Sequence, residues 1–298
     1  WYDSESVLVS TSPIFQYEVG TFDIELIARG SAGPVVASAG TGCTLDTGFE
    51  LLDAVWSIYN GFEPIGTLEG STPSFTFDSP GTYRADAKGR TADGAEHLWR
   101  ISVICDGEVA QEFAWTYDDA EYTVSVSIGY LHYLDLHGRS QDIRGTVGEG
   151  SIVFADPSDP VIAALASKLE SMASGIGLDP VETADFILAF VQSMGSDGTK
   201  LWKYPVEVLF ETSGNDRSCS ALYASLMSSL GYRSSLLLFP GHTAAGVEIE
   251  GSKGVFYSYY GIKYRYCECS PSSDESVGEK PEGIANRVSM ILEVRSQE

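Results

Sequence analysis

The sequence predicts an α+β protein of two domains, with an all-β sandwich over residues 1–108 and a mixed α+β domain over residues 109–298. The length of 298 residues and the hydrophobic content of 43% are enough for two ordinary cores. Short alternating segments broken by Gly, Ser, Pro and Asp fill residues 1–108, which is typical of sandwich strands. Helical periodicity begins only in residues 156–298, so the helices are expected there.

The alternation of the N-terminal domain is clearest in residues 22–28, 74–77 and 97–104. The runs 55–59, 74–84 and 92–94 resemble polycystic-kidney-disease-type (PKD) immunoglobulin-like domains of surface proteins. That resemblance implies an immunoglobulin-like spacer or adhesive module and not a catalyst.

The N-terminal domain contains two cysteines, Cys43 and Cys105. A disulfide between its two sheets is one interpretation, and it suits an exported protein. Two separately buried thiols are the other, and the sequence leaves both open.

Residues 109–155 form a second β-rich stretch, in which residues 112–117 and 122–133 flank a turn at 118–119. This pattern predicts a long hairpin that joins the sheet of the second domain. His132 and His137 lie in this stretch with no Cys or carboxylate at ligand spacing, so surface or structural roles are expected.

Two helices are expected next, at about 160–173 and 180–194. Each follows an Asp-Pro pair, and Glu182 completes a capping box for the second helix. The segment 195–205 is expected to be a loop, in which Trp202 either walls a cleft or fills the core.

Residues 207–249 are predicted to form a loop, a helix and a strand, with Cys219 near the helix start and His242 at the strand start. A helix N-terminus favours a thiolate, so Cys219 is a candidate nucleophile when a base lies close. The base is His242, because no other histidine follows residue 137. Cys219 also continues the apolar stripe of its helix, and this favours a buried structural thiol instead.

The segment 261–270 alternates in polarity, which places Tyr264, Tyr266 and Glu268 on one strand face. Glu268 is therefore available to orient the imidazole of His242, and Cys219, His242 and Glu268 form a candidate catalytic triad. Cys267 and Cys269 fall on the other face, where small buried hydrophobic roles are expected.

Residues 205–282 resemble the archaeal branch of the transglutaminase-like superfamily, most clearly around Gly241-His242 and Glu268. The resemblance implies a papain-like α+β core and a Cys-His-acid triad that acylates on a glutamine or peptide carbonyl. It also makes Gln192, within Phe190-Val191-Gln192, a candidate oxyanion donor, although an ordinary role at a helix end is the simpler interpretation.

The sequence departs from this family at the nucleophile. Counted back from Leu230-Gly231, the family position falls on Asp216, and Cys219 lies one helical turn later. Three hypotheses follow. The first is a cysteine peptidase or acyltransferase with a displaced Cys219. The second is a catalytically inactive binding or structural domain in which Asp216 is hydrogen-bonded to His242. The third is a metal site made of Asp216, His242 and Glu268, and it ranks last.

The balance of 42 acidic against 18 basic residues, a net charge of −24, argues against nucleic acid or an anionic membrane as a partner. A protein or peptide substrate or ligand is expected instead, with no cofactor, while the sequence leaves the oligomeric state open.

No apolar run is long enough to span a bilayer. Because the chain begins at Trp1 and not at Met, we expect a removed export signal or anchor and a location at the cell surface or outside the cell.

Overall fold

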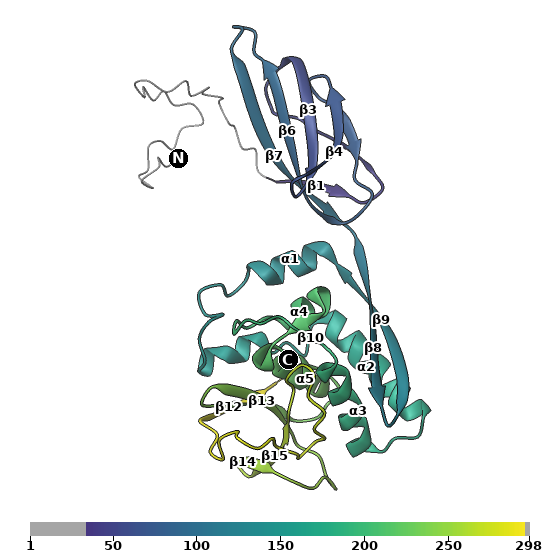
Figure 1. The fold of residues 1–298 in the computed structure, drawn as a ribbon, viewed down its shortest axis with the longest axis vertical. Coiled ribbons are helices and arrows are strands. Elements are labelled where there is room, and N and C mark those ends of the chain that lie inside the picture. The colour runs from purple at the N-terminus through teal and green to yellow at the C-terminus, as the bar shows by residue number, and fades with distance from the viewer. Residues whose placement is uncertain (1–33, 296–298) are drawn as a thin grey trace. The chain divides into compact units, whose positions relative to one another are not determined.

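The computed structural model describes residues 34–295, so the predicted strand at 22–28 lies outside the described residues. The chain divides into an N-terminal unit of residues 1–108 and 129–131 and a C-terminal unit of residues 109–128 and 132–298. Together they make a mixed α+β protein (Figure 1). No helix in the described range is long and apolar enough to cross a membrane.

The N-terminal unit contains a five-stranded sheet in the order β1-β7-β6-β3-β4 and a two-stranded sheet of β2 and β5. Alternate residues of β3, β6 and β7 are buried, because successive side chains of a strand point to opposite faces. These residues form one apolar cluster with Leu45 and Phe77. The strands are β1 (Val35–Ser38), β2 (Gly42–Thr44), β3 (Leu52–Asn60), β4 (Glu63–Glu69), β5 (Ser74–Thr76), β6 (Gly81–Arg90) and β7 (Glu96–Asp106).

Cys43 and Cys105 are both free thiols. Cys105 is fully buried, while Cys43 is half-buried against the same apolar cluster. The disulfide interpretation is therefore wrong for this structure, in which both thiols stay unbonded.

A two-stranded hairpin opens the C-terminal unit, with β8 (Glu108–Tyr117) and β9 (Ala120–Gly129). Its turn places Asp118 and Asp119 at φ of 48° and 60°, as a tight hairpin turn with two left-handed residues requires. The hairpin pairs only with itself, so the prediction that it joins the larger sheet is wrong. The predicted extent of 109–155 is also too long, because the strand ends at Gly129 and a helix follows.

Aromatic packing holds the hairpin to the helical layer. The ring of Trp115 lies 5.2 Å from Phe186 and 5.3 Å from Phe190, both on α3 (Pro180–Gln192). Tyr122 also packs edge-on against Phe186 at 5.0 Å. Such contacts supply the apolar burial that an isolated hairpin lacks in water.

The helices begin close to where their caps predict. The Asp159 carboxylate accepts from Val161 N, and Asp179 forms a capping box with Glu182. Asn215 caps α5, and its side-chain oxygen accepts from the backbone N–H groups of Arg217 and Ser218. The helical elements are α1 (Tyr130–Gly138), the 3-10 helix η1 (Glu149–Phe154), α2 (Pro160–Gly175), α3, α4 (Pro205–Glu211) and α5 (Asp216–Ser229).

The C-terminal sheet is antiparallel in the order β14-β15-β13-β12-β16. One face packs on the helical layer through Cys267 and Cys269, while Tyr264 and Tyr266 belong to a separate cluster on the other face, as the alternation predicts. Its strands are β12 (Ser234–Phe239), β13 (His242–Val247), β14 (Phe256–Tyr259), β15 (Ile262–Cys267) and β16 (Met290–Val294), and the short β10 (Gly195–Ser196) pairs with β11 (Ser213–Gly214).

Candidate functional site

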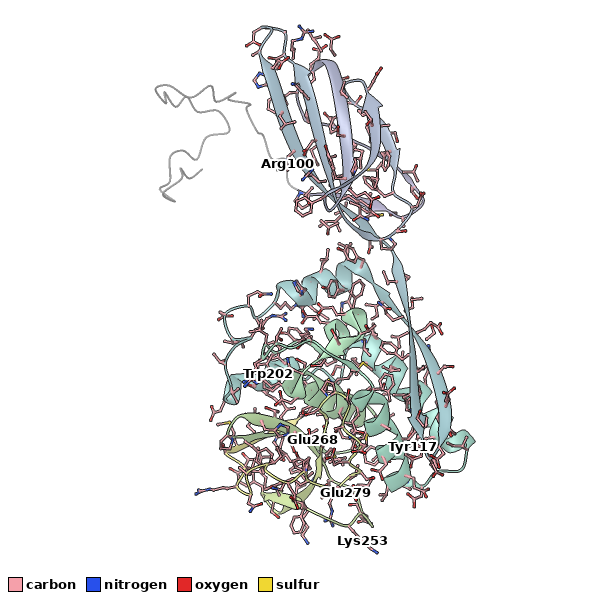
Figure 2. The ribbon with its side chains drawn as sticks, in the orientation of Figure 1. Arg100, Tyr117, Trp202, Lys253, Glu268 and Glu279 are labelled. Atoms are coloured by element: carbon pink, nitrogen blue, oxygen red, sulfur yellow. The ribbon has the colours of Figure 1, made fainter. Side chains whose placement is uncertain are left out.

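Three element ends meet at the candidate site. Asp216 is the first residue of α5, His242 is the first residue of β13, and Glu268 directly follows β15 (Figure 2 labels Glu268). Because β13 and β15 are antiparallel neighbours in the sheet, the start of β13 at His242 and the end of β15 before Glu268 lie at the same end of the two strands. The start of α5 contacts this end of the sheet, because the backbone N–H of Thr243 donates to Asp216 Oδ2 at 2.8 Å.

The imidazole of His242 lies between two carboxylates. Its Nε2 is 3.1 Å from Glu268 Oε2, and its Nδ1 is 3.4 Å from Asp216 Oδ2. The side chain of His242 is 15% exposed, compared with 22% for Asp216 and 3% for Glu268. The structure therefore brings together Asp216, His242 and Glu268 in a half-buried cluster.

Glu268 is held by a set of hydrogen bonds. Its Oε1 accepts from the Ser270 backbone N at 3.1 Å and from Ser270 Oγ at 2.6 Å. The hydroxyl of Tyr266 donates to Oε2 at 2.5 Å and also lies 3.2 Å from His242 Nε2. The alternation of β15 put Tyr266 on the Glu268 face, but no local pattern indicated that its hydroxyl completes the site.

Charge pairing controls the protonation of this cluster. Burial alone lowers the pKa of His242, but the contacts with Asp216 and Glu268 outweigh it and raise that pKa to about 9. Burial opposes ionisation of Glu268 as well, yet His242, Ser270 and Tyr266 lower its pKa below the ordinary value. At neutral pH the cluster is an imidazolium between carboxylates.

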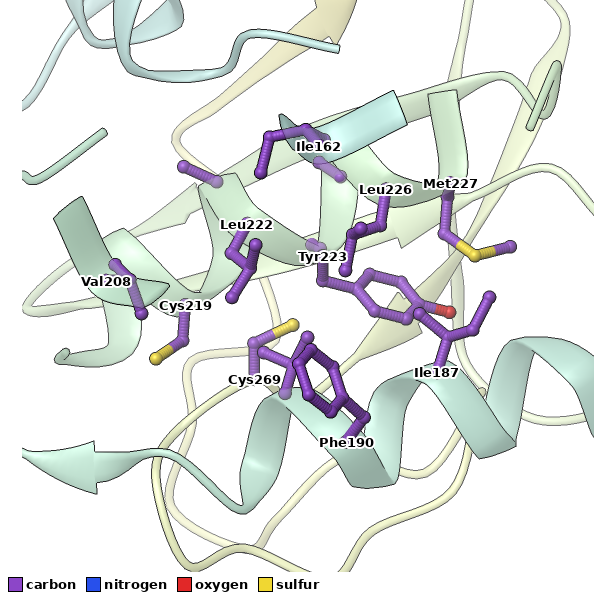
Figure 3. Close-up of a cluster of buried hydrophobic side chains, with 14 of the residues drawn as sticks. Ile162, Ile187, Phe190, Val208, Cys219, Leu222, Tyr223, Leu226, Met227 and Cys269 are labelled. Atoms are coloured by element: carbon purple, nitrogen blue, oxygen red, sulfur yellow. The ribbon is translucent and has the colours of Figure 1, made fainter. Parts of the chain in front are cut away.

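Cys219 does not join the cluster. It is fully buried, and Figure 3 shows it among apolar side chains that include Val208, Leu222 and Cys269. A Cβ added at Gly214 would lie 2.9 Å from its sulfur, so the thiol packs against that loop. Within residues 34–295 no hydrogen bond or ion pair links it to His242.

Burial also suppresses the reactivity of Cys219. Desolvation is the largest influence on its thiol, and the charges of Asp197 and Asp216 act in the same direction, so its pKa rises far above the ordinary value. The nucleophile predicted at Cys219 is therefore not placed for attack. The apolar stripe of α5, and not its N-terminus, determines the environment of this side chain.

Gln192 has no amide hydrogen available for an oxyanion. Its Nε2 donates to the backbone oxygens of Glu268, at 2.8 Å, and Glu275, at 2.9 Å. The side chain is 6% exposed and ties the end of α3 to the loop after β15. Trp202 is also structural, because it is fully buried and its ring N–H donates to the backbone oxygen of Thr146.

The metal-site hypothesis does not fit the observed geometry. Asp216 and Glu268 contact opposite nitrogens of the imidazole, so no single point lies within coordination distance of both carboxylates and the ring. The cluster whose ligand atoms do converge within the described range is His137, Glu207 and Glu211.

That second cluster is occupied by protein cations. Both carboxylate oxygens of the fully buried Glu207 accept from Arg144 Nη1, each at 3.0 Å, and Glu211 pairs with Lys203 at 2.8 Å. His137 adds a 3.0 Å contact to Glu207. A metal ion would have to displace these partners, so the cluster is an ion-pair network that joins α1 to α4.

Comparison with known proteins gives little further guidance. No protein-family model matches the chain, and no curated protein matches it. A solved structure described as a "putative cysteine protease" from Cytophaga hutchinsonii is 10% identical and aligns over 80% of this chain and 78% of its own, with a TM-score of 0.29. At this level the similarity assigns neither a fold nor an activity.

Proposed function

We propose that the C-terminal unit is a transglutaminase-like domain without catalytic turnover, which serves binding or surface architecture. The observation that carries the proposal is the residue opposite His242 Nδ1. It is the carboxylate of Asp216 at 3.4 Å, where a cysteine hydrolase requires a thiolate.

The state of His242 supports the same conclusion. A general base needs an unprotonated ring nitrogen that can accept the nucleophile's proton. With a pKa of about 9, the ring carries both protons at neutral pH, and a carboxylate faces each nitrogen. The cluster is suited to fixing α5 against β13 and β15, since charged partners at 22% exposure or less resist separation more than fully exposed ones do.

The proposal extends to the whole chain. The N-terminal unit acts as an immunoglobulin-like spacer or adhesive module, and the protein is exported or held at the cell surface. Its net charge of −24 favours a protein or peptide partner with basic groups over a polyanion.

Iodoacetamide modification of the native protein, read at each cysteine by peptide mass mapping over a pH series, tests this proposal. We expect Cys219 to stay unmodified while the fold is intact, because its sulfur is enclosed and its pKa is raised. Half-buried Cys43 provides the internal positive control. Fast labelling of Cys219 with an apparent pKa below ~8.5, slowed by His242→Ala, would establish the displaced-nucleophile enzyme instead.

A further inference from the structure

A separate cavity lies between the hairpin and the last turns of α3, and we call it the hairpin pocket. Its volume is about 430 Å³, within the usual range for ligand sites. Its walls are residues 115–118 at the end of β8 and the following turn, three residues of α3 together with Ser193 directly after it, and the loop 272–276. Figure 2 labels Tyr117 on this hairpin.

The pocket wall is acidic and uncompensated. Asp118, Asp185, Asp274 and Glu275 line it, and no Lys, Arg or His does. None of these carboxylates forms an ion pair with another residue of the range 34–295, in contrast to Glu207 and Glu268 elsewhere in the same unit. Carboxylates gathered on the walls of a concave site attract cations.

Asp185 is the most enclosed of these acids. One of its oxygens accepts from Val277 N at 2.6 Å. Burial is the main reason that its pKa is raised, and the charges of Glu279, Asp179 and Glu182 add to the effect. A cation bound beside it would offset this penalty.

Two buried polar atoms of the same wall lack partners. Among residues 34–295, the indole Nε1 of Trp115 finds no hydrogen-bond acceptor, and Ser273 Oγ finds no hydrogen-bond partner; Trp115 itself is 5% exposed. A buried donor without an acceptor is unfavourable, so a ligand oxygen that reaches it gains affinity. Ser272, Asp274 and Ser276 of the same wall are exposed.

We propose that the hairpin pocket binds an arginine side chain of a peptide ligand. The guanidinium group offers five donors in one plane, and the pocket presents carboxylates from α3, from the hairpin turn and from the loop. The rings of Trp115 and Tyr117 favour a flat cation over a compact ammonium. The peptide carbonyl of the same residue supplies the acceptor that the Trp115 indole lacks.

This inference adds a ligand class to the proposed binding role, and it does not depend on the charge state of the His242 cluster. Its failure would leave the cysteine-labelling result intact, and fast labelling of Cys219 would leave the pocket intact. The two proposals can therefore be refuted separately.

The test is an NMR titration with Nα-acetyl-arginine amide, followed at the indole N–H resonance of Trp115. The matched probe is Nα-acetyl-citrulline amide, which has nearly the same shape without the charge. For a ligand of this size we expect a Kd of about 1 mM for the arginine probe and a Kd at least roughly tenfold weaker for the citrulline probe.

Variants connect the signal to the pocket. Asp185→Asn keeps an oxygen for Val277 N–H but removes the charge, and we expect it to weaken binding about fivefold. Asp142→Asn changes an exposed acid outside the pocket wall and should leave the Kd unchanged. If Asp185→Asn does not fold, Asp274→Asn, at an exposed loop position, replaces it with the same expected direction.

Equal shifts with both probes, no shift of the Trp115 resonance, or full affinity in a folded Asp185→Asn or Asp274→Asn variant would overturn the proposal. A larger shift with Ca²⁺ alone than with the arginine probe would also overturn it, because that would identify the pocket as a metal site.

Discussion

Replacing Asp216 with cysteine is expected to produce the reactive thiol that this site lacks. In Asp216→Cys the new sulfur lies at the start of α5, opposite His242 Nδ1, where the carboxylate now lies at 3.4 Å. The backbone N–H of Thr243, which donates to Asp216 at 2.8 Å, is available to the thiolate as well. The imidazolium of His242, the N-terminus of α5 and the amide of Thr243 all stabilise the negative charge of the new thiolate.

The size of the effect follows from the thiol pKa. Activated cysteines have pKa values of ~3.5–7.5, and a value of about 5.5 makes roughly three quarters of the new thiol ionised at pH 6, compared with about 0.3% of a free thiol at pKa ~8.5. The weaker nucleophilicity of a low-pKa thiolate reduces this advantage by about 20-fold. The variant should therefore react about tenfold faster than a free thiol at pH 6.

The assay is iodoacetamide labelling between pH 5 and 9, read at each cysteine by mass mapping. Asp216→Cys combined with His242→Gln is the matched control, and its thiol should lose the low pKa. The reasoning fails if the Asp216→Cys thiol reacts no faster than Cys43, whose pKa burial raises, or if the double variant reacts as fast as the single one.

Two further predictions concern the forces that hold the C-terminal unit together. Since the pKa of His242 is raised from 6.5 to about 9 on folding, its stabilisation is complete below pH 6.5 and is lost as the pH rises through 9, by about 3 kcal/mol in total. Urea unfolding of the C-terminal unit, followed by hydrogen exchange of α5 at pH 6.5 and pH 10, measures this loss as the difference between the native protein and His242→Gln. The difference is needed because burial also raises the pKa values of Cys219, Cys267 and Cys269, and their ionisation on unfolding lowers the stability of both proteins above pH ~8.5. Gln192→Leu leaves the backbone oxygens of Glu268 and Glu275 without their donors, so we expect about 2–4 kcal/mol of destabilisation and faster exchange in residues 268–277. Unchanged exchange there would show that the Gln192 amide does not hold this loop.

Local rules were sufficient for the starts of α2 and α3 and for the faces of β15. The Asp-Pro pairs at 159–160 and 179–180 predicted the starts of α2 and α3, because an aspartate cap and a proline at the first helical position act within one turn. Period-two alternation correctly separated Tyr266 from Cys267.

Long-range pairing was not predictable from those rules. The strands of the β8–β9 hairpin alternate in polarity as the strands of a larger sheet do. The hairpin nevertheless packs on α3 through the ring of Trp115 and does not pair with a third strand. The start of α1 at Tyr130 was missed because aromatic and β-branched residues continue across the strand end at Gly129. Gln192 forms its hydrogen bonds to residues more than seventy positions later, so only the assembled fold reveals its role.

The site itself was predicted in part. Counting from the end of α5 singled out Asp216, and its carboxylate lies 3.4 Å from His242 Nδ1. A cysteine near a helix start was the competing signal. It was misleading because the buried stripe of α5 begins at that turn, so Cys219 lies in the core.

The protonation state of His242 is the most direct test of whether this residue is a paired imidazolium or a general base. Ring ¹⁵N–¹H correlation spectra of the native protein resolve its histidines, of which there are four, and His242→Gln assigns the relevant signals. We expect a ring that is protonated on both nitrogens at pH 7 and titrates near 9. A ring that is neutral at pH 7, with a midpoint at or below 6.5, would contradict this expectation and would restore His242 as a general base.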